Sequence, residues 1–120
     1  MSRTSHLIGA LALAVGLGGC ASTSSEPVAL TDDTIIIDVR TPQEYAEEHL
    51  DGAQLLDLTG GELAAALPTL DAEAEYLVYC RSGNRSAQAT AMLQDAGFEN
   101  VTDLGSLDDA ATATQLPIVG

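Results

Sequence analysis

The 120-residue sequence has no lysine and no tryptophan, and its four basic residues stand against 18 acidic ones. The formal net charge at pH 7 is −14. A surface of this sign repels the phosphates of nucleic acids and the headgroups of anionic lipids. The composition therefore argues against a nucleic-acid partner and against membrane docking through a basic patch.

The chain also lacks an apolar run long enough to span a bilayer, which takes about 20 residues. Its longest run, at residues 7–17, follows an arginine and is typical of a secretory signal. The run ends in Leu-Gly-Gly-Cys at residues 17–20, which resembles the lipobox of bacterial lipoproteins. The resemblance implies a signal peptide at 1–19 and lipidation of Cys20. An ordinary secretory signal with an incidental cysteine is the alternative.

After the signal, the sequence predicts a tether and one domain. Residues 20–27 are small and polar, and we expect a flexible tether there. Residues 28–120 suffice for one modest core. We expect the mature chain to be held by acyl chains in the bacterial cell envelope, on the extracytoplasmic side, either in the periplasm or on the outer face of the plasma membrane.

Cysteine occurs only twice, at Cys20 and Cys80. Two cysteines in an exported protein can form a disulfide. Lipidation would consume Cys20, however, and a remaining lone thiol in an oxidising compartment indicates a use for Cys80. No His, Cys and carboxylate cluster has the spacing of a metal site, so we expect neither a metal nor another cofactor.

Short apolar runs alternate with helical patterns along the domain. Residues 34–39 and 76–79 are rich in β-branched or aromatic residues and suit strands buried on both faces. Alternating strands and helices predict a small parallel-sheet α/β domain with helices on both faces. Shorter strands are expected at 53–58 and 101–104, and helices at 42–48, 62–67, 85–96 and 108–114.

Three helix ends carry specific signals. Thr41 and Glu44 are spaced as a capping box, with a proline at the first helical position between them. Gly97 is expected at the C′ position of its helix, with Phe98 folding back on the helix end. Pro68 is expected to stop the short helix before it.

Cys80 lies between a predicted strand and a predicted helix, where ligands bind in parallel α/β folds. A helix N-terminus and nearby arginines lower a cysteine pKa and supply the nucleophilic thiolate. Arg81 and Arg85 flank this thiol, and Gly83 lets the loop turn its amides inward as an anion-binding nest.

The spacing from Cys80 to Arg85 bears on which anion the loop suits. Cys-dependent phosphatases resemble this strand–loop–helix arrangement, but their loop is one residue longer, and Ser86 stands at the position of their arginine. A shorter loop makes a tighter cup, which suits one sulfur atom better than a phosphoryl group.

Several segments, in order and spacing, resemble the rhodanese family of single-domain sulfurtransferases. The resemblance extends from Ile35 to about Leu104, and the loop around Cys80 is its most specific part. The segments are IIDVR at 36–40, EY at 44–45, HLDGA at 49–53, VYCRSGNRS at 78–86, and AGF at 96–98 followed by Val101.

The resemblance implies a small parallel-sheet fold and a two-step sulfur transfer. The Cys80 thiolate would take the outer sulfur of a donor such as thiosulfate or a persulfide, and then pass it to cyanide or a thiol. Arg85 would fix the shape and charge of the loop, and Arg81 would face the anionic end of the donor. The substrate-binding residues would be Arg81, Ser82, Gly83, Asn84 and Ser86.

Other polar residues near the loop allow more than one interpretation. Asp38 and Arg40 would form either a buried ion pair that braces the loop or a pair that only supports its own turn. His49 could be a general base, but a thiolate needs none, so a packed structural role is favoured. Glu44 is interpreted as a helix cap.

The sequence departs from the family pattern at three places. Little chain precedes Ile35, where members have a further strand and helix. Glu48 stands where a glycine commonly precedes the histidine, and Gly105-Ser106-Leu107 replaces a Gly-Gly-aromatic segment. These changes leave the sulfur loop intact, but they put the edge of the sheet and the substrate mouth in question.

Two other functions stay open at this point. One is a non-enzymatic rhodanese-like module that carries sulfur or binds a partner, although loss of the cysteine is its usual sign. The other is a Cys-dependent phosphatase or arsenate reductase, which the shorter loop disfavours.

Overall fold

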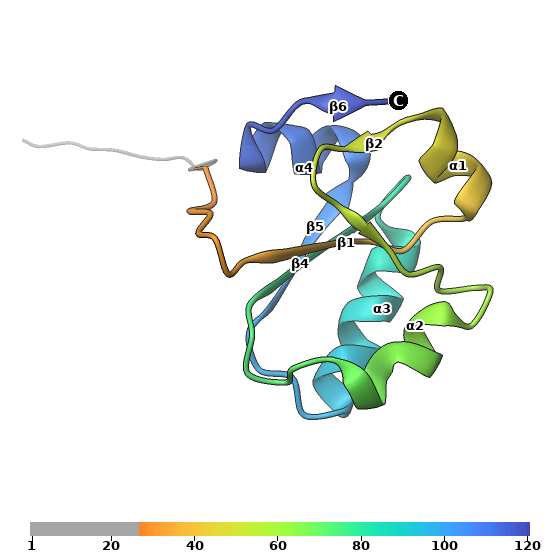
Figure 1. Ribbon diagram of the computed structural model, residues 1–120, viewed down its shortest axis with the longest axis vertical. Helices are drawn as coiled ribbons and strands as arrows, with labels where there is room; N and C mark the ends of the chain where they lie inside the picture. The colour runs from red at the N-terminus through yellow and green to blue at the C-terminus, as the bar shows by residue number, and fades with distance from the viewer. Residues whose placement is uncertain (1–26) are drawn as a thin grey trace, which may run out of the picture.

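The computed structural model describes residues 27–120 (Figure 1). The predicted signal peptide, Cys20 and all but the last residue of the tether lie outside the described residues. Within the described part, no helix has the length and apolar character needed to cross a membrane.

A parallel sheet with strand order β3-β1-β4-β5 forms the centre of the domain. β1 and β4 are its two inner strands and pair along the whole of β1, from Ile35 opposite Tyr76 to Asp38 opposite Tyr79. This order confirms the predicted parallel α/β architecture. The bounds are β1 (Ile35–Asp38), β3 (Gln54–Leu55), β4 (Tyr76–Cys80) and β5 (Val101–Ser106).

Helices cover both faces of this sheet, as predicted (Figure 1). α2 (Glu62–Ala66) and α3 (Asn84–Asp95) lie on one face, and α4 (Leu107–Thr114) lies on the other. α1 (Pro42–Glu47) follows the carboxyl end of β1. A short antiparallel pair, β2 (His49–Leu50) with β6 (Ile118–Val119), was not predicted from the sequence.

β4 contributes to the cores on both faces because its side chains alternate. Tyr76, Val78 and Cys80 pack with α2 and α3. Leu77 and Tyr79 pack on the opposite side with α4. All five residues are completely buried, which explains the unbroken apolar run in the sequence. Burial of each large aliphatic side chain contributes about 1.5–3 kcal/mol of transfer free energy.

The capping signals at α1 and α3 are confirmed. The Thr41 hydroxyl accepts the Glu44 N–H at 3.2 Å, and the Glu44 carboxylate accepts the Thr41 N–H at 3.0 Å. After α3, Gly97 has φ +98°, and the Phe98 N–H reaches back to the Leu93 carbonyl at 3.0 Å. This is the Schellman arrangement expected of a C′ glycine.

One of two expected boundaries is confirmed and the other was wrong. α2 ends at Ala66, before Pro68 as predicted, and a separate 3-10 turn at Leu67–Thr69 follows with the proline in its first turn. The strand expected at 53–58 is reduced to Gln54–Leu55, because the backbone N–H and carbonyl of buried Asp57 bond to the start of α2 instead of continuing the strand.

The segment that departs from the family pattern near the C-terminus is ordered into the fold. β5 extends to Ser106, beyond the expected Leu104, and places Ser106 opposite Cys80. The Ser106 hydroxyl then caps α4 by accepting the Asp109 N–H at 3.0 Å. At the other end, Val28 packs against the α4 core, and its N–H bonds the Ala113 carbonyl. On the side of the sheet that α4 covers, these contacts complete the core, and the described residues before β1 contain no helix.

Candidate active site

Cys80 is the last residue of β4 and is completely buried. The loop after it is short, because α3 begins at Asn84. Gly83 is the N-cap of α3 and adopts φ +101°, a left-handed conformation that residues with a side chain rarely adopt. The glycine therefore allows the chain to turn from the strand into the helix while its own N–H stays within hydrogen-bond distance of the Cys80 sulfur.

Hydrogen bonds from the loop stabilise negative charge on the Cys80 sulfur. The Gly83 N–H donates to Sγ at 2.9 Å, and the hydroxyl of buried Ser86 lies 3.5 Å from Sγ. Burial by itself raises the pKa of the Cys80 thiol. The hydrogen bond between Sγ and the Ser86 hydroxyl, together with bonds from the N–H groups of Ser86, Gly83 and Ser82, outweighs that burial and lowers the pKa.

Arg85 is held at the rim of the loop by a carboxylate from α1. Its guanidinium donates two hydrogen bonds to Glu44, at 2.8 and 3.1 Å. The hydrogen bond from Arg85 is the main reason that the pKa of Glu44 falls to about 2; burial opposes the shift, and bonds from Thr41 add to it. Arg81 also reaches Glu44, at 3.9 Å, but its side chain is 76% exposed. Both predicted loop arginines therefore converge on one carboxylate.

The second role of Glu44 was missed from the sequence, which indicated only a cap. The same carboxylate completes the capping box and binds Arg85 across the sheet edge. The predicted order of the strands could have indicated this second role. β1 and β4 are neighbouring parallel strands, so the helix that follows β1 begins beside the loop that follows β4. A carboxylate in the first turn of that helix is then within reach of the loop arginines.

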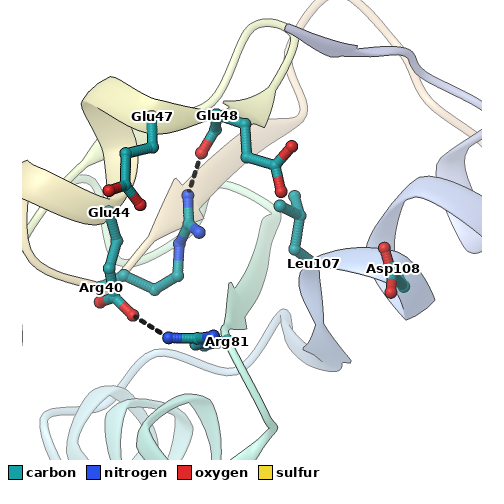
Figure 2. A pocket seen from close by; sticks show the side chains of 7 residues that line it. All are labelled: Arg40, Glu44, Glu47, Glu48, Arg81, Leu107 and Asp108. Carbon is teal, nitrogen blue, oxygen red and sulfur yellow. Dashed lines mark hydrogen bonds and ion pairs between the residues drawn. The ribbon is translucent and has the colours of Figure 1, made fainter. Parts of the chain in front are cut away.

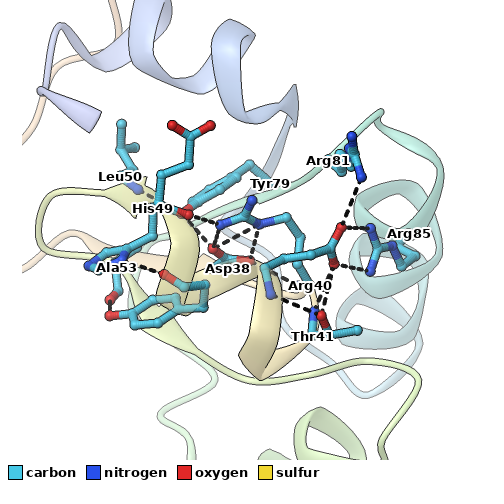
Figure 3. Close-up of polar contacts among 12 residues, drawn as sticks. Asp38, Arg40, Thr41, His49, Leu50, Ala53, Tyr79, Arg81 and Arg85 are labelled. Carbon is cyan, nitrogen blue, oxygen red and sulfur yellow. Dashed lines mark hydrogen bonds and ion pairs between the residues drawn. The ribbon is translucent and has the colours of Figure 1, made fainter. Parts of the chain in front are cut away.

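Asp38 and Arg40 form a buried ion pair at the carboxyl end of β1, next to β4 (Figure 3). The guanidinium donates to both Asp38 oxygens at 2.7 to 3.0 Å, and also to the Glu48 carbonyl at 2.6 Å. The Tyr79 hydroxyl donates to Asp38 at 2.7 Å and accepts the Leu50 N–H at 2.9 Å. Because Tyr79 directly precedes Cys80 in β4, the pair is connected to the strand that carries the loop.

His49 packs against α1 and makes its contacts there. Its ring stacks on Tyr45 with centroids 3.7 Å apart, and its Nδ1 lies 2.9 Å from the Tyr45 carbonyl. These contacts favour the structural role over that of a general base. Of the other loop residues, the side chains of Ser82 and Asn84 are exposed.

A cavity of about 270 Å³ lies at this end of the sheet, next to the loop (Figure 2). Two of the departures from the family pattern line it, Glu48 and Leu107. Four of the residues that line this cavity are acidic. The lining residues are Arg40, Glu44, Glu47, Glu48, Arg81, Leu107 and Asp108. Among residues 27–120, no group of His, Cys, Asp and Glu side chains could hold a metal ion.

Comparison with known proteins gives consistent relatives. A family model described as a rhodanese-like domain matches residues 25–109. The thiosulfate sulfurtransferase PspE of Escherichia coli is 34% identical over 96 residues, which cover 80% of this chain and 90% of that protein. The thiosulfate sulfurtransferase GlpE of Pseudomonas entomophila is 39% identical over 70 residues, covering 58% of this chain and 62% of that protein.

Solved structures agree with this fold. An Escherichia coli structure described as a rhodanese with anions has a TM-score of 0.60 and 34% identity, covering 72% of this chain and 96% of that one. The Anabaena Alr3790 protein has a TM-score of 0.65 and 27% identity, covering 75% of this chain and 80% of that one.

Proposed function

Because this chain belongs to the rhodanese-like domain family and is an enzyme of the thiosulfate sulfurtransferase type, we propose that it transfers sulfane sulfur as a persulfide on Cys80. The observation that carries the proposal is the position of Sγ, 2.9 Å from the Gly83 N–H and beside the Ser86 hydroxyl. Such donors stabilise a thiolate before the reaction and a persulfide anion after it.

The reaction proceeds in two displacements. The Cys80 thiolate attacks the outer sulfur of thiosulfate, the new S–S bond forms, and sulfite leaves with the electron pair of the bond that breaks. An acceptor thiolate or cyanide then attacks the outer sulfur of the persulfide, and Cys80 leaves as the thiolate. Charge balances in each step, so neither requires an external oxidant or reductant.

The loop residues divide these tasks between them. The backbone amides of Ser82, Gly83 and Ser86 stabilise the charged sulfur. Asn84 begins α3, so its backbone adds to the helix N-terminus that points at the loop. Arg85 fixes the position of the loop through its ion pair, and the exposed side chain of Arg81 faces the anionic end of a donor. Asp38 and Arg40 support this arrangement from behind.

We also propose an extracytoplasmic location, with the domain anchored through lipid on Cys20. The support is the Leu-Gly-Gly-Cys pattern after a short apolar run in the sequence. Growth with a labelled fatty acid tests the anchor. Label should appear on the native chain, and a Cys20→Ser variant should carry none. Label on that variant, or no label on the native chain, would contradict the proposal.

The test of the activity is a mass measurement. After incubation with thiosulfate and removal of the excess, the intact protein should gain roughly the mass of one sulfur atom on Cys80. Cyanide should reverse the gain, and Cys80→Ser should abolish it. A protein that gains no sulfur but hydrolyses an aryl phosphate would instead be a Cys-dependent phosphatase. A protein that does neither would be a binding module.

A further inference from the structure

The sulfur loop contains two arginines, yet little of their positive charge is free. Arg85 donates from both terminal guanidinium nitrogens to Glu44, and Arg81 lies 3.9 Å from the same carboxylate. We propose that Glu44 determines donor specificity, because it compensates the loop arginines and so disfavours donors with two negative charges relative to donors with one. The inference rests on the proposed sulfur transfer and names the donor class of that site.

Glu44 is well placed for this effect because its own geometry is fixed. Its carboxylate accepts the Thr41 N–H and hydroxyl at 3.0 and 3.2 Å, while it also accepts both bonds from Arg85. The pKa of Glu44 is about 2, chiefly because of Arg85, so the carboxylate is ionised throughout the neutral range. Arg85 therefore always meets a negative partner there.

No other arginine among the described residues replaces the lost positive charge. Arg40 lines the cavity, but its guanidinium is buried against Asp38 in a bidentate pair. The ion pairs of the described residues thus leave only Arg81 largely exposed at the mouth. A dianion that enters the site therefore meets one exposed arginine instead of two.

The rest of the cavity wall adds negative charge. Glu47, Glu48 and Asp108 line it, and none of them forms an ion pair within residues 27–120 (Figure 2). The repulsion between two charges is proportional to their product. A carboxylate in the wall therefore repels thiosulfate, a dianion, about twice as strongly as a monoanion at the same distance. Alkyl thiosulfonates, which carry one negative charge, represent the class of sulfane donor that this site would favour.

Thiosulfate and methanethiosulfonate form a matched pair of donors for the test. Each gives its outer sulfur to the Cys80 thiolate, and sulfite or methanesulfinate leaves with the electron pair. The measured quantity is the ratio of kcat/KM for thiosulfate to kcat/KM for methanethiosulfonate, with cyanide as acceptor. The full chain is used, and a Cys80→Ser variant subtracts any reaction at Cys20.

Glu44→Gln is the informative variant. Glutamine also completes a capping box, so the helix start is retained while the charge is removed. Glu47→Gln removes a cavity charge without freeing an arginine, and Glu99→Gln removes a charge near the amino ends of the strands, where Asn100 bonds the Tyr76 N–H.

We expect Glu44→Gln to raise the ratio roughly threefold to tenfold, Glu47→Gln to raise it less, and Glu99→Gln to leave it unchanged. Added salt should raise the native ratio and should raise the Glu44→Gln ratio less, because screening weakens the same repulsion. A loss of structure alone would lower both rates without this salt pattern.

The results separate the two proposals. If the native protein takes sulfur from both donors and Glu44→Gln leaves their ratio unchanged or lowers it, the specificity role is overturned and the sulfurtransferase function stands. If the native protein takes sulfur from neither donor, the proposed function fails, and the inference fails with it.

Discussion

Two ion pairs lie at the carboxyl end of the sheet, and they differ in depth. The Asp38–Arg40 pair is buried, with side chains 0% and 4% exposed, whereas the Glu44–Arg85 pair is about one-fifth exposed, at 19% and 22%. Both have a guanidinium that donates more than one bond to a carboxylate. The same chemistry therefore occurs at two depths: the deep pair bonds the Glu48 carbonyl and the Tyr79 hydroxyl, and the rim pair joins α1 to Arg85.

Removal of one partner from the deep pair should have the largest effect on stability. Asp38→Asn leaves the Arg40 guanidinium buried without a counter-charge, which typically costs about 3–5 kcal/mol. Urea denaturation should show a correspondingly lower free energy of unfolding. Asp51→Asn, which changes an exposed aspartate, is the matched control and should stay within about 0.5 kcal/mol of the native protein. Similar losses for both variants would show that the deep pair has no special role.

Loss of the Tyr79 hydroxyl, which links the deep pair to β4, should lower the free energy of unfolding less than Asp38→Asn does. Tyr79→Phe removes the donor to Asp38 and the acceptor of the Leu50 N–H, and leaves both buried groups short of a partner. We expect a loss of about 1–3 kcal/mol in the free energy of unfolding. Tyr45→Phe, which removes a bond to the Ala53 carbonyl at a half-buried site, should cost less. Equal costs would mean that Asp38 does not depend on Tyr79.

Removal of the rim charge should have the smallest effect on stability. Glu44→Gln keeps the cap and hydrogen-bond acceptors, so we expect a loss of about 1 kcal/mol at pH 7. The pKa of Glu44 is lowered from 4.5 to about 2 by folding, so its contribution is fully present above about pH 4.5 and is lost as the pH falls towards 2.

Stability curves of the two proteins against pH test the sign of this contribution. The difference in the free energy of unfolding between the native protein and Glu44→Gln should shrink between pH 5 and 2. A difference that stays constant, or grows as the pH falls, would show that the Glu44 carboxylate is not stabilised by ionic partners in the folded state.

The same comparison shows what the sequence predicts and what it leaves open. The Asp38–Arg40 pair joins the last residue of β1 to a residue two positions further on, and the sequence predicted it. The contacts from Tyr79 to Asp38 and from Arg85 to Glu44 each cross 41 positions, so they depend on strand order and on side-chain directions at the sheet edge. The β2–β6 pairing was missed for the same reason.

The candidate site shows the same division. The order strand, cysteine, glycine loop and helix is local, so the positions of Cys80 and Gly83 followed from the sequence. The acidic cavity wall did not, because Glu48 and Asp108 come from segments that meet only in the folded chain. Its proposed effect on donors therefore depends on the tertiary structure.

The ionisation of the Cys80 thiol tests the central claim most directly. The rate of alkylation is measured against pH in the native protein and in Ser86→Ala, with mass spectrometry of peptides to separate Cys80 from Cys20. The structure predicts a midpoint below that of an ordinary cysteine, about 8.5, and a higher midpoint in Ser86→Ala, because the hydroxyl helps to lower the pKa of the thiol. A native midpoint at or above the ordinary value would contradict a loop built to hold an anionic sulfur.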